Sequence, residues 1–179
     1  MSIILRATLL SFLVPILLSG CGGGGGTSSA QPAEAPKSVA EAITAADKSG
    51  SLPALNRDTT VSGPDSDSNG VRDDIDTYIS SLSDTTAQKN ALRQMSIALG
   101  KAMVANTANQ SSLLSASKLI ADASACTHAR YDSSTASKKN AEIEKLTVNT
   151  KTRFLAYEKF SAAISGTSFV LPQGDGCAN

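Results

Sequence analysis

Apolar side chains recur at steps of three and four residues along most of the chain beyond residue 37, which is the spacing of a helix that buries one face. No stretch of four to eight residues alternates apolar and polar positions as a half-buried strand does. The periodic segments are 39–46, 71–82, 92–103, 113–127 and 143–164. This pattern predicts an all-α fold, a small helical bundle of three or four main helices.

Helix-breaking and capping residues separate these segments. We expect a short helix over 37–48, followed by an irregular loop over 51–70, because that segment holds two Pro and two Gly. Asp84 or Thr85 can cap the helix that contains the third periodic segment. The last periodic segment is expected to form one long helix over about 136–164.

The first part of the chain has the pattern of an export signal. One early charge, Arg6, precedes an apolar run over 7–18 that Pro15 interrupts. The run is too short for a mature span, which needs about 20 residues. It ends in Leu18-Ser19-Gly20-Cys21, which resembles the lipobox of bacterial lipoproteins.

The lipobox resemblance implies that residues 1–20 are a signal peptide cut off just before Cys21, and that Cys21 carries acyl chains, palmitate among them. Each buried CH₂ of an acyl chain contributes about 0.8 kcal/mol, so several chains hold a protein on a membrane. The resemblance therefore implies a lipid-anchored protein of the bacterial cell envelope. Gly22, where inner-membrane lipoproteins carry Asp, favours the outer membrane. The alternative is a plain secretory signal followed by a chance Cys.

Residues 21–36 join this anchor to the rest of the chain. After Cys21 their sequence, GGGGGTSSAQPAEAP, is rich in Gly, Ser, Ala and Pro and too poor in apolar residues to bury a core. We expect a flexible tether with a reach of roughly 20 Å. The predicted organisation is a signal peptide over 1–20, the lipidated Cys and tether over 21–36, and a helical domain over 37–179.

The chain has three cysteines, and lipidation of Cys21 would leave Cys126 and Cys177. In an oxidising envelope this even pair predicts a disulfide, which would close a loop of about fifty residues and contribute roughly 4 kcal/mol. Two thiols that never meet are the alternative, because sequence does not fix their geometry. Cys126 and His128 cannot share a zinc ion on one helix, since their directions differ by about 200°.

The segment 65–76, DSDSNGVRDDID, matches the pattern D-x-D-x-[DN]-G-x-x-D-x-x-D. Oxygen ligands at alternate positions around a tight turn suit calcium, a hard ion that takes roughly six to eight oxygens. Gly70 permits the sharp turn that a Cβ would resist. The expected calcium ligands are Asp65, Asp67, Asn69, Val71 through its carbonyl, Asp73 and Asp76.

This loop resembles those of EF-hand, dockerin and thrombospondin type 3 calcium proteins, and is similar to a segment of uncharacterised secreted proteobacterial proteins. Gly63-Pro64 cannot belong to an incoming helix. Arg72 stands at the eighth loop position, where paired EF-hands carry an apolar residue, and Asp76 replaces the usual Glu. These departures indicate a structural site with a dissociation constant of about 10⁻⁴–10⁻³ M. The alternative is a solvated acidic turn that complements the dipole of the next helix.

Charge and composition exclude several functions. The 16 basic side chains balance the 16 acidic ones without a local basic cluster, so we expect no nucleic-acid partner. His128 is the only His, and no Ser lies in a G-x-S-x-G setting. We therefore expect no catalytic residue and interpret the chain as a non-enzymatic envelope lipoprotein. Its calcium-stabilised helical domain would bind an envelope protein or support envelope structure.

Two alternatives to this interpretation stay open at the level of sequence. One is a hydrolase, or a hydrolase accessory, that acts on the cell wall or on exopolymers and uses carboxylates such as Asp73 or Asp74. The other is an inhibitor or immunity protein for a periplasmic enzyme.

Overall fold

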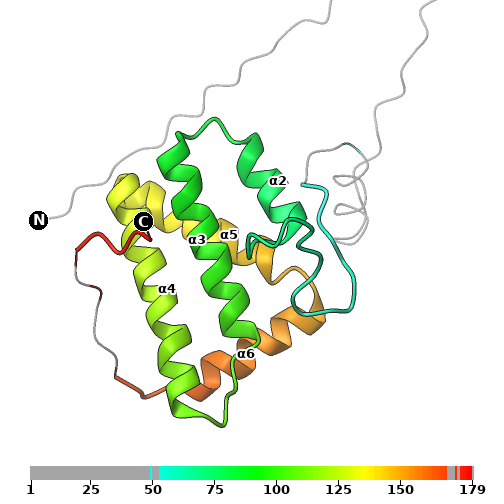
Figure 1. Cartoon of the computed structure of the whole chain (residues 1–179), viewed down its shortest axis with the longest axis vertical. Coiled ribbons are helices and arrows are strands. Elements are labelled where there is room, and N and C mark those ends of the chain that lie inside the picture. The colour runs from blue at the N-terminus through cyan, green and yellow to red at the C-terminus, as the bar shows by residue number, and fades with distance from the viewer. Residues whose placement is uncertain (1–48, 50–52, 169–171, 173, 179) are drawn as a thin grey trace, which may run out of the picture. The chain divides into compact units, whose positions relative to one another are not determined.

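The computed structural model of the chain describes residues 49, 53–168, 172 and 174–178. The signal peptide, the tether, the lipobox Cys and the short helix expected at 37–48 lie outside these described residues. The described helices are α2 (Asp73–Ser81), α3 (Thr86–Met103), α4 (Gln110–Arg130), α5 (Ser133–Thr147) and α6 (Lys151–Ile164) (Figure 1). No strand is present in the part of the chain described, and the predicted all-α bundle is confirmed.

The two longest helices, α3 with 18 residues and α4 with 21, lie side by side (Figure 1). Small side chains are buried on both of them: Ala91, Ala98 and Ala102 on α3, and Ala116 and Ala123 on α4. Side chains of this size let two helix axes approach closely. The alanine-rich stripes that the sequence shows therefore form the centre of the bundle.

Larger apolar side chains fill the space where α2, α3, α4 and α5 meet. The buried members of this main core are Val71, Ile75, Ile79, Leu92, Met95, Ala98, Leu99, Ala123 and Ile143. Burying a side chain of the size of Leu or Ile stabilises the fold by about 1.5–3 kcal/mol. Because Val71 and Ile75 belong to the acidic segment 65–76, the second half of that segment is fixed on the core.

Side-chain caps begin four of the five described helices. Thr85 accepts a hydrogen bond from the backbone nitrogen of Gln88, and the Gln88 side chain accepts one from the backbone nitrogen of Thr85, which is a capping box. Thr85 is therefore the cap of α3, whereas Asp84 pairs with Lys139 at 3.1 Å. The other capping side chains are Asn109, Asp132 and Thr150.

The expectation of one long helix over about 136–164 is wrong. The structure has two helices there, α5 and α6, which are separated by residues 148–150. The last carbonyls of a helix lack intrahelical partners, and at the end of α5 those of Leu146 and Thr147 accept hydrogen bonds from Arg72 at 3.0 and 3.1 Å. The end of α5 therefore provides two carbonyl acceptors for the buried guanidinium of Arg72, which belongs to the acidic segment.

Candidate metal-binding loop

The acidic loop, residues 65–76, consists of an irregular turn over 65–72 and the first residues of α2. Ser68 (φ 59°) and Gly70 (φ 85°) both adopt the left-handed backbone region, and Gly70 can do so without the strain of a Cβ. The backbone nitrogen of Asp73 donates to the carbonyl of Pro64 at 2.9 Å and closes the loop at its base. The turn predicted at Gly70 is confirmed.

Three carboxylates converge inside this turn. One oxygen from each of Asp65, Asp67 and Asp73 lies within 4.8 Å of the others. Asp65 accepts hydrogen bonds from the backbone nitrogens of Asn69 at 3.1 Å and Gly70 at 2.9 Å, which fold the chain back over it. Like charges at this spacing repel one another, and a bound divalent cation would offset that repulsion. The arrangement can offer three carboxylate oxygens to a hard metal ion.

Asp73 is held in this group by Ser66. The Ser66 backbone nitrogen donates to Oδ1 of Asp73 at 2.8 Å, and the Ser66 hydroxyl donates to Oδ2 at 2.6 Å. These two hydrogen bonds lower the pKa of Asp73 below its usual value. The carboxyl group is therefore ionised at neutral pH, as a metal ligand has to be.

The other three predicted ligands, Asn69, Val71 and Asp76, lie in three different surroundings. The Asn69 side chain accepts from the backbone nitrogen of Val71 at 2.7 Å and donates to Asp67 at 3.0 Å, so it lies beside the carboxylates. The Val71 side chain is buried in the core. Asp76 accepts from Nε of Arg93 at 2.6 Å and is absent from the convergent group. The structure thus keeps Asn69 in the turn and pairs Asp76 with α3.

Arg72, at the eighth position of the loop, faces the bundle. It donates to both oxygens of Asp74, at 2.5 and 2.9 Å, and the two side chains are only 4% and 8% exposed. Its remaining bonds reach the carbonyls at the C-terminal, negative end of α5. Gly63 packs so closely that a Cβ there would overlap the Arg72 side chain. Arg72 therefore fastens the loop to a packed surface.

Arg153 of α6 holds the segment that precedes the loop. This fully buried guanidinium donates to the carbonyls of Asn56 at 2.7 Å and Val61 at 3.2 Å, and to the carboxylate of Asp58 at 2.8 Å. Burial, followed by the nearby charge of Arg72, lowers the pKa of Arg153. An arginine side chain nevertheless stays charged in proteins. Sequence reasoning missed both arginines, because their partners lie up to 97 positions away along the chain.

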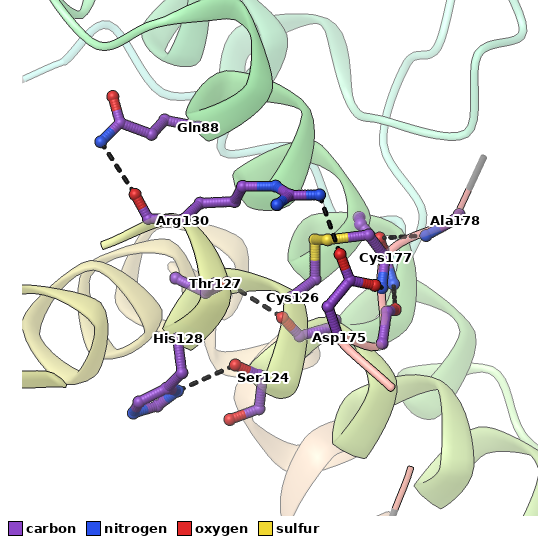
Figure 2. Close-up of a disulfide and its surroundings, with 12 residues drawn as sticks. Gln88, Ser124, Cys126, Thr127, His128, Arg130, Asp175, Cys177 and Ala178 are labelled. Atoms are coloured by element: carbon purple, nitrogen blue, oxygen red, sulfur yellow. Dashed lines mark hydrogen bonds and ion pairs between the residues drawn. A yellow bond between two sulfur atoms is a disulfide. The ribbon is translucent and has the colours of Figure 1, made fainter. Parts of the chain in front are cut away.

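Cys126 and Cys177 lie at disulfide distance, with their Cα atoms 4.6 Å apart and 51 positions between them (Figure 2). This confirms the predicted pair. Cys126 is buried on α4, and its sulfur faces Cys177 rather than a metal. His128 points the other way, and its Nδ1 bonds the carbonyl of Ser124 at 2.8 Å (Figure 2).

The C-terminal strap, residues 174–178, lies against α3 and α4. The Gln94 side chain donates to the carbonyl of Gly176 at 2.7 Å and accepts from the backbone nitrogen of Ala178 at 2.9 Å. An ion pair between Arg130 and Asp175 adds a contact of 2.9 Å (Figure 2). The strap is therefore held by backbone and polar contacts besides its disulfide.

Asp74, which the hydrolase alternative would use, and two glutamates of α5 have structural partners. Asp74 is bound by Arg72, as described above. Glu142 accepts a hydrogen bond from the hydroxyl of Tyr78, and Glu144 accepts one from Tyr157 at 3.4 Å. Burial, followed by the charge of Glu144, raises the pKa of Tyr157 to about 12. These contacts join neighbouring helices and assemble no pair of free carboxylates.

Two hollows lie on the bundle outside the group of three convergent carboxylates. One, of about 620 Å³, lies between α3, α4 and the C-terminal strap and is lined in part by Ile97, Leu119 and Asp122. The other, of about 510 Å³, follows α4 past Ile120 and His128. Neither is lined by the three convergent carboxylates. The first hollow nevertheless borders the acidic loop, because its lining residues Arg93 and Ile97 bind Asp76 and lie beside Gly70, respectively.

No known family model matches the chain, and no curated protein or solved structure matches it either. The helices of the described residues include none that has both the length and the apolar character needed to cross a membrane. The function therefore has to be argued from the residues and their geometry.

Proposed function

We propose that this chain is a lipid-anchored protein of the bacterial cell envelope. Its helical domain binds a calcium ion in the acidic loop and has a binding or structural role rather than a catalytic one. The observation that carries this proposal is the convergence of Asp65, Asp67 and Asp73 within 4.8 Å in a turn that is packed onto the bundle. The anchor rests on the lipobox at Leu18-Ser19-Gly20-Cys21.

The donor set favours calcium over a softer metal. All three convergent groups are carboxylates, and the Asn69 side chain lies beside them, with its amide nitrogen donating to Asp67. Carboxylate and carbonyl oxygens suit calcium and magnesium, whereas zinc in proteins takes nitrogen and sulfur ligands as well. Only Oδ1 of Asp76 engages Arg93. Asp76 would therefore join the ion by turning towards it or through a water molecule.

The attachment of the loop favours a stabilising role for the ion. Val71 is buried in the main core, and Arg72 binds the end of α5. A ligand that binds only the folded state adds RT ln(1 + [L]/Kd) to the free energy of unfolding. Calcium in this turn would therefore stabilise α2 and α5 as well as the loop.

Thermal unfolding of the mature chain from residue 21, with Cys21→Ser in place of the acyl anchor, tests the calcium site. Saturating calcium at 100 times the dissociation constant should raise the free energy of unfolding by about 2.7 kcal/mol over excess chelator. Asp65→Ala and Asp67→Ala should abolish this difference. Glu158→Ala, which removes an exposed carboxylate on α6, should leave it intact. Equal melting in calcium and chelator would overturn the calcium assignment.

The anchor is tested separately by metabolic labelling with palmitate in bacterial cells. The wild-type chain should incorporate label and sediment with the membrane fraction, and Cys21→Ala should do neither. Labelling that persists in Cys21→Ala, or its absence from the wild type, would overturn the anchor without bearing on calcium.

A further inference from the structure

Two large apolar side chains stand next to each other on the outside of α6. Phe154 is 49% exposed and Leu155 is 55% exposed. The buried residues of α6 are Arg153 and Phe160. Because Arg153 turns inward to hold the segment before the loop, the next two residues of the helix, Phe154 and Leu155, face outward. Exposure of this kind carries a free-energy cost that a partner surface would remove.

Charged side chains flank this pair along the helix. Successive helical residues are about 100° apart, so Lys151 and Lys159, one turn before and after Leu155, share its face. The exposed residues of this α6 outer face are Lys151, Thr152, Phe154, Leu155, Glu158, Lys159 and Ala162. The face has two positive charges against one negative charge. Aromatic and aliphatic side chains edged by lysines are typical of a helix that lies in a lipid headgroup region.

The point where the chain enters the described domain lies beside α6. Arg153 binds the carbonyls of Asn56 and Val61, so the chain that comes from Cys21 enters the described domain beside α6. The tether expected over 22–36 would have a root-mean-square reach of roughly 20 Å, and the short helix expected over 37–48 would add about 18 Å. An acyl chain at Cys21 would thus keep the α6 outer face at a high effective concentration next to lipid headgroups.

We propose that the α6 outer face docks on the anionic lipid surface to which the chain is tethered, with Phe154 and Leu155 inserted at headgroup depth and Lys151 and Lys159 against lipid phosphates. This deepens the proposed function and rests on its lipid anchor. Docking would fix the orientation of the domain on the membrane, whereas the tether alone leaves the orientation free.

The chain has no Trp, so a single introduced Trp reports its own environment. Leu155→Trp is the probe, and Val104→Trp is its matched control, because both parent side chains are 55% exposed. Each mature chain is coupled through the Cys21 thiol to a maleimide lipid in vesicles of phosphatidylethanolamine and phosphatidylglycerol. Coupling in this way supplies the anchor whether or not the cell lipidates Cys21.

Emission of the Leu155→Trp chain should shift to the blue on vesicles and be quenched by brominated lipid, whereas emission of the Val104→Trp chain should not change. For the uncoupled Cys21→Ser chain, Phe154→Ser should weaken partition into the same vesicles about tenfold. High salt should weaken it further, since lysine contacts with lipid are screened.

Emission that is the same for both probes on coupled vesicles would overturn the docking, while palmitate labelling would still decide the anchor. A blue shift of the Leu155→Trp chain that depends on protein concentration and needs no vesicles would also overturn it. That result would assign the face to self-association of the chain.

Discussion

The acidic loop and the C-terminal strap are both short, polar, glycine-containing segments, yet both lie fixed on helices. The loop is fixed from within, because Val71 enters the core and Arg72 binds Asp74 and the end of α5. The strap buries none of its described side chains fully and is held by the bond between Cys177 and Cys126 and by the Gln94 side chain.

This difference shows two ways to order a segment that cannot bury enough apolar surface to offset its conformational entropy. The loop uses non-covalent anchors and carboxylates that a metal ion can bridge, so its order should respond to calcium and to pH. The strap uses a covalent bond, so its order should respond to reduction and not to chelation. The predictions that follow separate these two kinds of attachment.

The largest effect is expected for Arg72→Met. This change removes the positive partner of Asp74, whose side chain is 8% exposed, and leaves a buried carboxylate without its counter-charge. Breaking a buried pair in this way typically costs about 3–5 kcal/mol. Denaturant unfolding in chelator would measure the loss, and hydrogen exchange should show it first in the acidic loop and at the end of α5.

Arg93→Met is the matched control for Arg72→Met. It removes the partner of Asp76 in an ion pair whose two side chains are each 27% exposed. Pairs with this much solvent contact contribute about 1 kcal/mol or less. Equal losses for the two variants would contradict the assignment of Arg72 as the principal anchor of the loop.

The second-largest loss of stability is expected when the disulfide of the strap is removed. Replacing both Cys126 and Cys177 by Ala should lower the free energy of unfolding by about 2–4 kcal/mol, because the disulfide restricts a long loop of the unfolded chain. Urea unfolding would measure this loss. Limited proteolysis should release the strap while the acidic loop keeps its protection and its calcium response. Loss of the calcium response in this variant would show that the two attachments are coupled.

A smaller effect is expected for Gly176→Ala in the strap. Gly176 has φ 71°, and an added Cβ would overlap the carbonyl oxygen of Asp122 and lie 2.8 Å from the Cβ of Ala125. The matched variant is Gly174→Ala, which has φ 76° and open space around it. Both changes strain the backbone, but only the first adds an overlap, which should cost about 1–3 kcal/mol more. Thermal unfolding measures this difference. Equal losses of stability in Gly176→Ala and Gly174→Ala would show that the strap shifts freely to relieve the overlap.

The smallest effect concerns the pH dependence of the loop. Asp73 has a pKa lowered by its bonds to Ser66, so its contribution to stability is present above the unfolded pKa and is lost as the pH falls through the folded pKa. Ser66→Ala should raise the pKa of Asp73 towards its unfolded value of about 3.9. NMR titration of the carboxyl carbons would measure the shift.

Asp132 is the internal control in the same titration. Its pKa is lowered by bonds to Thr135, at the start of α5, and Ser66→Ala should leave it unchanged. An unaltered pKa of Asp73 in that variant would contradict the role of Ser66.

The sequence predicted those features that depend on near neighbours along the chain. The apolar periods of α2, α3 and α4, a cap at Asp84 or Thr85, of which the structure uses Thr85, and the turn at Gly70 all follow from residues within a few positions of each other. The convergence of Asp65 and Asp67 belongs to the same group, since the turn itself brings these carboxylates together.

The sequence did not predict features that depend on distant partners. A regular apolar period predicted one helix where α5 and α6 break at 148–150, because the carbonyls freed there bind Arg72, about 75 positions away. It gave no sign that Arg153 would occupy the interior and leave Phe154 exposed. It also grouped Asp76 with the other carboxylates, although Arg93 draws it towards α3.

The sequence by itself therefore determined the helical class, the turn of the acidic loop and the chemistry of its oxygen donors, because short-range spacing and residue type suffice for these. Only the tertiary structure decided which charges were buried and which apolar side chains were left outside. The burial of a charge depends on acceptors that distant segments bring to it, and Arg72 and Arg153 find theirs only in the folded bundle.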